Sequence, residues 1–287
     1  MNTCENYSNN IINNINNIDD NDNNIYNNES NESNESNESK IINIDAWNEA
    51  INDNEFIIKN KISRIFPQLK NANNYLKLMI DEDSFSFITI REIAELTSKI
   101  ICYHLIKYNI NPQKIKIIDY TAGVGGNAIS FGKYFNYTYA IEIDKTRADY
   151  LLNNINVYNL KNIKIINDSS INFNNNNMIE INPNVIFIDP PWGGNCYRNN
   201  DLLKLTLGDM PIEELIIDIF DKYYTIITSA INSYSNRLVV LKLPKNYDIE
   251  YIYNYIKKNT DKKPYIICSY LYILNKMLIL VCEYKII

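Results

Sequence analysis

The chain has 287 residues, 46% of them hydrophobic, which is enough for one large folded domain with attached segments. Its net charge of −6 is unevenly distributed, because residues 1–55 hold 12 of the 34 acidic residues and 1 of the 28 basic residues. Residues 56–287 therefore carry 27 bases and 22 acids. This mildly basic balance is compatible with a nucleic-acid partner but does not by itself require one.

The cysteines and the single histidine exclude a zinc site of the usual kind. The five cysteines are scattered without a CxxC pair and His104 stands alone, whereas zinc needs clustered Cys and His ligands. No apolar run is long enough for a membrane span, and no signal-peptide pattern is present. We therefore expect an intracellular protein, nuclear or cytoplasmic, that works as a monomer without a metal ion or a membrane.

Residues 1–40 are predicted to be a disordered, Asn-rich acidic tail. They contain four NES triplets between Asn28 and Ser39, and they have too few apolar side chains to offset the entropy lost on ordering. We favour a neutral low-complexity tail over the alternative, a regulatory or phosphorylated segment.

Residues 41–110 are predicted to form a helical N-terminal extension. Apolar residues recur there at three-and-four spacing, at Ile57, Ile58, Ile62, Ile65, Phe66 and Leu69. A second helix is predicted from about Arg91 to Tyr108, after the possible cap Thr89. The aromatic stretch Ser84–Phe87 lies between the two helices.

Beyond this extension, in residues 111–287, short apolar runs alternate with helical stretches, which is typical of a doubly wound α/β sheet. The runs predict parallel strands at 114–120, 137–144, 163–167, 185–188 and 237–243. Helices are predicted at 126–135, 145–159, 211–233 and 248–258. Two further runs within 265–284 predict an antiparallel hairpin. Five parallel strands and a final hairpin form the seven-stranded, Rossmann-like sheet of class I methyltransferases.

Two glycine loops follow predicted strands. Three of the seven glycines lie within Gly123–Gly126, and two more are Gly193 and Gly194. Since ligands bind at the carboxyl edge of open α/β sheets, we expect the two loops to lie side by side. Asp119 ends the first strand, and an acid followed by a GxGG turn suits a cofactor with a cationic amino-acid end better than a pyrophosphate. A tight turn without a ligand is the alternative.

Further acids follow the second and third predicted strands. Glu142 is our candidate for accepting both ribose hydroxyls of a nucleoside cofactor, and Asp144 is predicted to cap the next helix. Asp168 is a candidate acceptor for an adenine amine, although an ordinary loop or capping aspartate is nearly as good an interpretation of it.

The fourth predicted strand ends in Asp189-Pro190-Pro191-Trp192, the most specific pattern in the chain. Asp189 and the Pro190 carbonyl can accept the hydrogens of an amine on a planar base. They would thereby localise its lone pair, which is otherwise delocalised into the ring, and aim it at a methyl donor. The prolines stiffen the loop, and Trp192 offers a face for stacking a base. A structural turn with a core tryptophan is the alternative.

Residues 56–287 resemble the trimethylguanosine synthases, which dimethylate the exocyclic N2 of 7-methylguanosine (m7G) RNA caps. The resemblance is carried by SFSFITIREIAE from Ser84, IDYTAGVGGNAISFG from Ile118 and DPPWGG from Asp189. It implies S-adenosyl-L-methionine as the methyl donor and m7G-capped RNA as the substrate, with one or two methyl groups added to N2. By this resemblance Thr89, Asp119, Gly123 and Glu142 match cofactor-binding positions, with Thr89 at the methionine carboxylate.

The resemblance also implies substrate-binding residues. Asp189 and Pro190 match the pair that orients the amine, and Trp192 matches the aromatic that stacks on 7-methylguanine. Three further residues match positions at the cap phosphates: Tyr197, Lys245 and Asn246. The chain departs from the family where Lys245 replaces an arginine, which gives up bidentate phosphate binding for a point charge. Phe87 also stands where relatives have a small polar residue, and Asp189 where some have serine.

Two other functions stay open at this stage. An amino-methyltransferase acting on adenine N6, or on guanine N2 of tRNA or rRNA, would share the Asp-Pro-Pro-Trp pattern. A non-catalytic RNA-binding module would keep the fold, although it would not need Asp119, Glu142 and Asp189 together.

Overall fold

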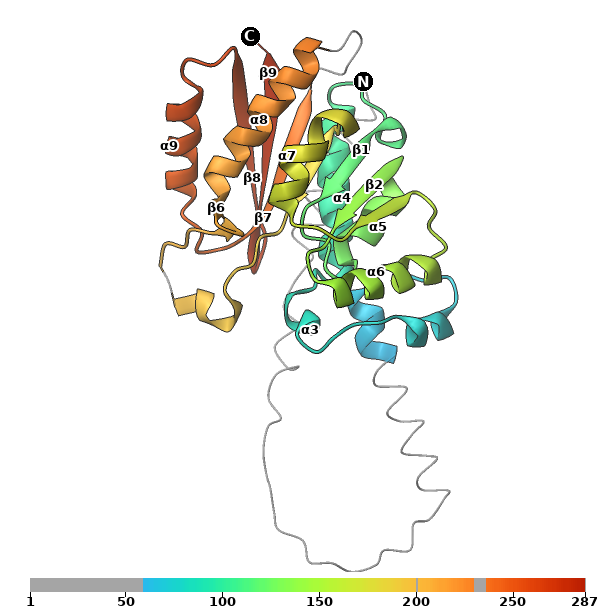
Figure 1. The fold of residues 1–287 in the computed structure, drawn as a ribbon. Helices are drawn as coiled ribbons and strands as arrows, with labels where there is room; N and C mark the ends of the chain where they lie inside the picture. Colours follow the sequence, from blue (N-terminus) through green and yellow to red (C-terminus); the bar gives the residue numbers. More distant parts are fainter. Residues whose placement is uncertain (1–58, 200, 230–235, 287) are drawn as a thin grey trace, which may run out of the picture.

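A seven-stranded sheet forms the centre of the structure (Figure 1). The computed structural model describes residues 59–199, 201–229 and 236–286. The strand order is β3-β2-β1-β4-β7-β9-β8. The strands are β1 (Lys116–Asp119), β2 (Tyr137–Ile141), β3 (Ile163–Ile166), β4 (Val185–Ile188), β7 (Arg237–Pro244), β8 (Tyr265–Ile273) and β9 (Met277–Ile286). The first five named are parallel, and β9 pairs antiparallel with both β7 and β8. This topology confirms the predicted class I methyltransferase fold.

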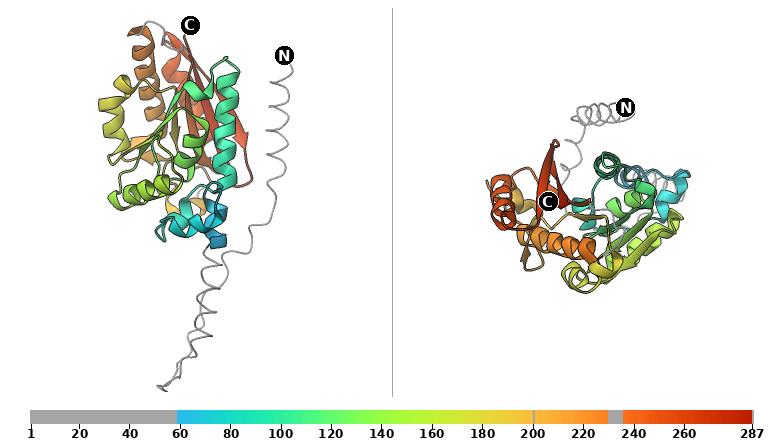
Figure 2. Two further views of the ribbon diagram at one scale, coloured as in Figure 1. Left: turned by 90° about the vertical axis from the view of Figure 1, so that its right-hand side faces the viewer. Right: turned by 90° about the horizontal axis from the view of Figure 1, so that it is seen from above.

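Helices cover both faces of the sheet, because neighbouring residues of each buried strand point to opposite sides. Ile117 packs against one helical layer, whereas Ile118 packs against the other. The first layer contains α4 (Arg91–Ile106), α5 (Gly126–Tyr134) and α6 (Lys145–Val157). The second contains α7 (Ser170–Ile181), α8 (Ile212–Ser229) and α9 (Ile249–Thr260). Figure 2 shows the sheet between these layers.

The short elements lie mostly in the connections between strands and helices. They are η1 (Ala72–Lys77), α3 (Ser84–Phe87), η2 (Pro112–Lys114), η3 (Gly194–Asn199) and the two-stranded pair β5 (Thr206–Leu207) and β6 (Met210–Pro211). The predicted aromatic stretch 84–87 is thus itself one helical turn.

Helix α7 is absent from our prediction. Its sequence contains four consecutive asparagines, residues 174–177, and asparagine is a poor helix former. The helix nevertheless forms because Phe173, Asn174 and Met178 are buried against the sheet. Tertiary packing therefore overrides the local preference.

The described part of the N-terminal extension packs on the first glycine loop. Residues 59–65 are helical, and Ile62, Ile65 and Phe66 join Val124 in one apolar cluster. The predicted boundaries of the extension and of the methyltransferase domain stay predictions. The predicted tail, residues 1–40, and the first part of the extension, including Ile57 and Ile58, lie outside the described residues.

One asparagine joins the extension to the glycine loop. Asn154, on α6, is fully buried. Its side chain accepts a hydrogen bond from the backbone N–H of Met79 at 2.7 Å and donates to the carbonyl oxygens of Met79 at 2.8 Å and Val124 at 2.9 Å. Asn154 therefore satisfies three backbone groups that the extension and the loop cannot pair within themselves.

We expect Asn154→Ala to lower the free energy of unfolding by about 2–4 kcal/mol, because it leaves these three backbone groups without their partners. Urea denaturation measures the change. Asn156→Ala is the matched control, since Asn156 lies on the same helix with an exposed side chain. It should change stability by less than about 0.5 kcal/mol. Equal effects of the two substitutions would contradict the assigned role.

Candidate functional site

The two glycine loops lie side by side, as predicted. The backbone N–H of Asp189 donates to the Thr121 hydroxyl at 2.8 Å, and the N–H of Tyr120 donates to the Phe187 carbonyl at 2.9 Å. These bonds exist because β1 and β4 are parallel neighbours whose carboxyl ends meet at one edge of the sheet. Side chains from both loops can therefore act on one bound molecule.

The first loop has a backbone that requires glycine. Gly123 has φ +52° and Gly125 has φ +112°, conformations that other residues rarely adopt. A Cβ atom built on Gly125 would lie 2.7 Å from Leu151 Cδ1, in the body of α6. The loop thus turns sharply from β1 into α5.

Asp119 is fully buried at the end of β1. Its Oδ1 accepts a hydrogen bond from Thr121 N at 3.0 Å, whereas Oδ2 has no hydrogen-bond partner among the described residues. Burial, together with the nearby carboxylates of Asp189 and Glu142, raises the pKa of the Asp119 carboxyl to about 7, although the hydrogen bond from Thr121 acts in the opposite direction. A buried acceptor of this kind suits a cationic ligand, which would stabilise the ionised form.

Glu142 follows β2 and supports the glycine loop. Its Oε2 accepts from Gly123 N at 2.8 Å and its Oε1 accepts from Asp144 N at 2.9 Å. Burial raises its pKa, while these two backbone hydrogen bonds act in the opposite direction. Each carboxylate oxygen keeps a second lone pair, so Glu142 can still accept hydroxyl groups from a ligand.

The structure separates the roles of the two remaining acids in this region. Asp144 accepts from Arg147 N at 2.9 Å and caps α6, which confirms that prediction. Asp168 is half-buried and accepts from Ser169 N at 2.7 Å, at the start of α7. The N-cap of α7 is Ser169, without a side-chain capping hydrogen bond, so Asp168 is a loop aspartate and not the helix cap. Its proposed contact with an adenine amine stays a prediction.

Asp189 belongs to a hydrogen-bonded network of four side chains. Its Oδ2 lies 2.5 Å from the Lys242 ammonium and 3.4 Å from the Thr89 hydroxyl. Thr89 Oγ1 in turn accepts from Lys242 Nζ at 3.0 Å and from Asn127 Nδ2 at 2.8 Å. The network therefore joins the strand ends of β4 and β7 to the start of α5 and to Thr89, two residues before α4.

Burial raises the pKa of the Asp189 carboxyl, and the adjacent Lys242 ammonium opposes that effect most strongly. The exposed fraction of the side chain is 13% for Asp189 and 5% for Lys242. The pair is thus largely shielded from water. In such a buried environment the attraction between two opposite charges is much stronger than on the protein surface.

Trp192 and Tyr197 form a wall beside Asp189. Their ring centroids are 5.2 Å apart at an interplanar angle of 76°, an edge-to-face arrangement. The buried indole N–H of Trp192 has no hydrogen-bond partner among the described residues. A pocket of about 260 Å³ adjoins these rings, and Lys204 lies on its rim with Leu203 and Leu205. An aromatic wall with a cation nearby is suited to a planar ring that carries phosphate.

The residues predicted at the cap phosphates lie close to this wall. Asn246 donates from Nδ2 to the Tyr197 carbonyl at 2.7 Å, so it positions the η3 turn, and the Lys245 side chain is exposed next to it. Phe87 is 47% exposed, and the guanidinium of Arg147 lies 4.8 Å from its ring centroid. A cation therefore already covers one side of Phe87.

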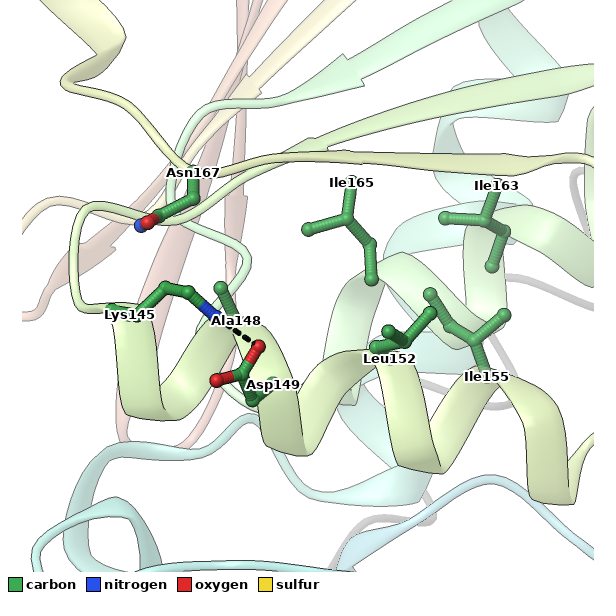
Figure 3. Close-up of a pocket in the computed structure, with 8 residues that line it drawn as sticks. All are labelled: Lys145, Ala148, Asp149, Leu152, Ile155, Ile163, Ile165 and Asn167. Atoms are coloured by element: carbon green, nitrogen blue, oxygen red, sulfur yellow. Dashed lines mark hydrogen bonds and ion pairs between the residues drawn. The ribbon is translucent and has the colours of Figure 1, made fainter.

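A second pocket is unrelated to this chemistry. It measures about 310 Å³ and lies between α6 and β3, where an ion pair, Lys145–Asp149, accompanies mostly apolar side chains such as Leu152 and Ile165 (Figure 3). Asn167, which lines this pocket, directly precedes Asp168 in the sequence.

Sequence reasoning missed Lys242 and Thr121. Lys242 is a charged residue within the apolar run 238–243, and a lysine near the carboxyl end of a buried strand is a signal that could have identified it. Thr121 carries no such signal, because its hydrogen bond to Asp189 depends on which strands are neighbours.

The family model for RNA cap guanine-N2 methyltransferases matches residues 114–285, more than half of the chain. The chain belongs to this family. Among the described residues of this methyltransferase, no group of His, Cys, Asp or Glu side chains could hold a metal ion. Within the same ranges, no helix is both long and apolar enough to cross a membrane.

Two relatives cover most of this methyltransferase. Uncharacterized protein L320 of Acanthamoeba polyphaga mimivirus is 31% identical over 215 residues, which is 69% of this chain and 79% of that protein. Trimethylguanosine synthase of Schizosaccharomyces pombe is 24% identical over 225 residues, which is 76% of this chain and 88% of that protein.

Solved structures include more distant matches. TYW2 of M. jannaschii in complex with AdoMet has a TM-score of 0.44 at 14% identity and covers 74% of this chain and 80% of its own. Precorrin-6y C5,15-methyltransferase of Geobacter metallireducens has the same TM-score and identity and covers 72% of this chain and 97% of its own.

We expect Thr121→Val to slow methyl transfer about tenfold, because the Asp189 N–H loses its acceptor and the reacting loop shifts. Thr121→Ser, which keeps the hydroxyl, should retain most of the activity. Thr225→Val is the control, since that threonine is exposed on α8. Single-turnover kinetics measure the rate, and wild-type turnover by Thr121→Val would show that the loop does not depend on this bond.

Proposed function

We propose that this methyltransferase transfers a methyl group from S-adenosyl-L-methionine to the exocyclic N2 of a 7-methylguanosine RNA cap. The observation that carries the proposal is the hydrogen bond between Thr121 and Asp189. It brings the Asp119 glycine loop, suited to a cationic cofactor, against an Asp-Pro-Pro-Trp loop suited to a base amine. The family to which the chain belongs supports the same substrate.

The residues at the first loop fit the proposed cofactor. Asp119 holds the methionine ammonium with Oδ2, the buried oxygen that lacks a partner among the described residues. Glu142 accepts the ribose hydroxyls with its remaining lone pairs, and Asp168 accepts from the adenine amine. When bound, S-adenosyl-L-methionine supplies a methyl group made electrophilic by its sulfonium sulfur.

Two further residues complete the proposed cofactor site. Gly123 brings its backbone close to the methionine end, since it has no side chain. Thr89 contacts the methionine carboxylate. For that contact its hydroxyl must exchange the bond to Asp189, which at 3.4 Å is the longest of the network.

Asp189 and Pro190 orient the amine. The Asp189 carboxylate and the Pro190 carbonyl accept its two hydrogens, so the nitrogen lone pair leaves the ring system and points along the line of displacement. Methyl transfer makes the amine cationic, and its proton then passes to water or to Asp189. Catalysis is thus mainly positioning and exclusion of water, with no separate general base required.

Trp192 selects the base. A base methylated at N7 carries a positive charge, and stacking it on the indole adds a cation–π attraction of about 1–2 kcal/mol to the stacking itself. Tyr197, Lys245 and Asn246 surround the cap phosphates. In this arrangement a neutral guanine or an adenine would lose the cationic part of the attraction.

The proposal is tested with radiolabelled S-adenosyl-L-methionine and three acceptors: an m7G-capped dinucleotide, the same dinucleotide without the N7 methyl group, and uncapped RNA. We expect label on the m7G cap, and mass spectrometry then counts one or two added methyl groups. Trp192→Ala should weaken cap binding by about 1–3 kcal/mol, whereas Trp192→Phe should keep most of it. Label confined to uncapped RNA would instead assign the chain to tRNA, rRNA or adenine methylation.

Binding of S-adenosyl-L-methionine should depend on pH through Asp119. With a pKa of about 7 in the free protein, this carboxyl is neutral below that pH and ionised above it. Because the ammonium binds the ionised form, we expect Kd to fall up to tenfold per unit from about pH 5.5 to about pH 7. Isothermal titration calorimetry measures Kd, and in this range binding should release a proton.

The Asp119→Asn variant separates the contribution of Asp119 to this pH dependence from those of Glu142 and Asp189, whose pKa values are also raised. This variant should bind the cofactor weakly and with little dependence on pH. A pH dependence that survives the substitution unchanged would assign it to another group.

A further inference from the structure

Lys242 is a lysine inside a buried strand. All eight residues of β7 are buried, and Lys242 itself is 4% exposed. Its neighbours Leu241 and Leu243 belong to the apolar core on the other face of the sheet. A buried ammonium is unfavourable unless it is paired and hydrogen-bonded, so its position calls for a specific partner.

That partner is the residue proposed to orient the amine. Among the described residues, Lys242 forms its ion pair with Asp189 Oδ2 at 2.5 Å and donates to the Thr89 hydroxyl at 3.0 Å. Its ammonium also lies 5.0 Å from the ring centroid of Trp192. The lysine thus contacts the groups on both sides of the place where the base amine is expected.

The other charges near Asp189 act against its ionisation. Asp119 lies at the end of the neighbouring β1, and its carboxyl and that of Asp189 raise each other's proton affinity. Glu142, after β2, adds negative charge to the same strand edge, where Arg147 partly offsets it. From β7, Lys242 is the cation that contacts Asp189 directly. Burial also raises the pKa of Asp189, and Lys242 opposes this effect most strongly.

The protonation state decides what Asp189 can do. An ionised carboxylate only accepts hydrogen bonds, whereas a protonated one also presents an O–H donor that competes with the amine N–H. A protonated Asp189 would also lose the charge that stabilises the cationic amine formed on transfer.

We propose that Lys242 is a positioning residue for methyl transfer, which keeps Asp189 in its ionised, acceptor-only form and holds its carboxylate in place for the substrate amine. The inference rests on the proposed function, because it assigns the lysine a task in that reaction. The lysine acts through Asp189 and takes no part in bond making.

The test compares the pH profiles of single-turnover methyl transfer for the wild type, Lys242→Met and Lys242→Arg. In Lys242→Met the rising limb of the profile, in which the rate increases with pH, should shift to higher pH by about one unit or more. The rate near pH 7 should fall tenfold or more. The lost rate should return at higher pH, where Asp189 ionises without help. Lys242→Arg should keep the wild-type limb, because it preserves the charge.

Lys116→Met is the matched control. Lys116 starts β1, at the opposite end of the sheet, and donates to the Ile181 carbonyl at 2.9 Å. Its loss should leave the pH profile unchanged. Calorimetry with S-adenosyl-L-methionine verifies that each variant folds. An unshifted limb in Lys242→Met, or a folded variant whose rate does not return at high pH, would overturn the positioning role.

A second measurement is independent of activity. Carbon-13 NMR of labelled aspartate side chains follows the titration of Asp189, identified by its loss in Asp189→Asn. The titration midpoint should rise by about one unit or more in Lys242→Met and not in Lys116→Met. If the wild type fails to methylate the cap but this shift is found, the proposed substrate fails and the charge effect stands. Cap methylation without this shift of the midpoint would support the proposed function and contradict the proposed role of Lys242.

Discussion

The parallel pairing of β1 with β4 is the constraint on which the site depends. It places the end of each strand at the same edge of the sheet, so that the loop after Asp119 and the loop after Ile188 begin side by side. The Thr121 hydroxyl then joins the two loops through the Asp189 N–H. In the proposed reaction a methyl donor and a base amine must meet within van der Waals distance, and loops that begin at one sheet edge can bring them together.

That edge concentrates negative charge. Asp119, Glu142 and Asp189 each have a pKa raised by burial, and the carboxylates of Asp189 and Glu142 contribute to raising that of Asp119. Such crowding is tolerated where ligands or nearby cations compensate for it. A cofactor with a cationic amino-acid end would compensate Asp119, whereas Lys242 compensates Asp189 from within the protein. The two loops thus differ in where their positive charge comes from.

The N-terminal extension supports the same edge from outside the sheet. Residues Ile62 and Phe66 pack against Val124 of the glycine loop, and Asn154 pairs the backbone of Met79 with that of Val124. Thr89, within the extension and two residues before α4, contacts Asp189 directly. The described part of the extension therefore contacts both loops as well as covering the sheet.

The sequence by itself determined the fold class and the strand ends at which the candidate site lies. Apolar runs ending in Asp119, Glu142 and Asp189 predict parallel strands whose tips share an edge, and this local patterning needs no tertiary information. Tertiary structure alone decided which asparagines matter, since Asn154 looks like any other in an Asn-rich chain until its burial is known. It also decided that Lys242 faces Asp189, because strand neighbours are set by long-range packing that sequence order does not reveal.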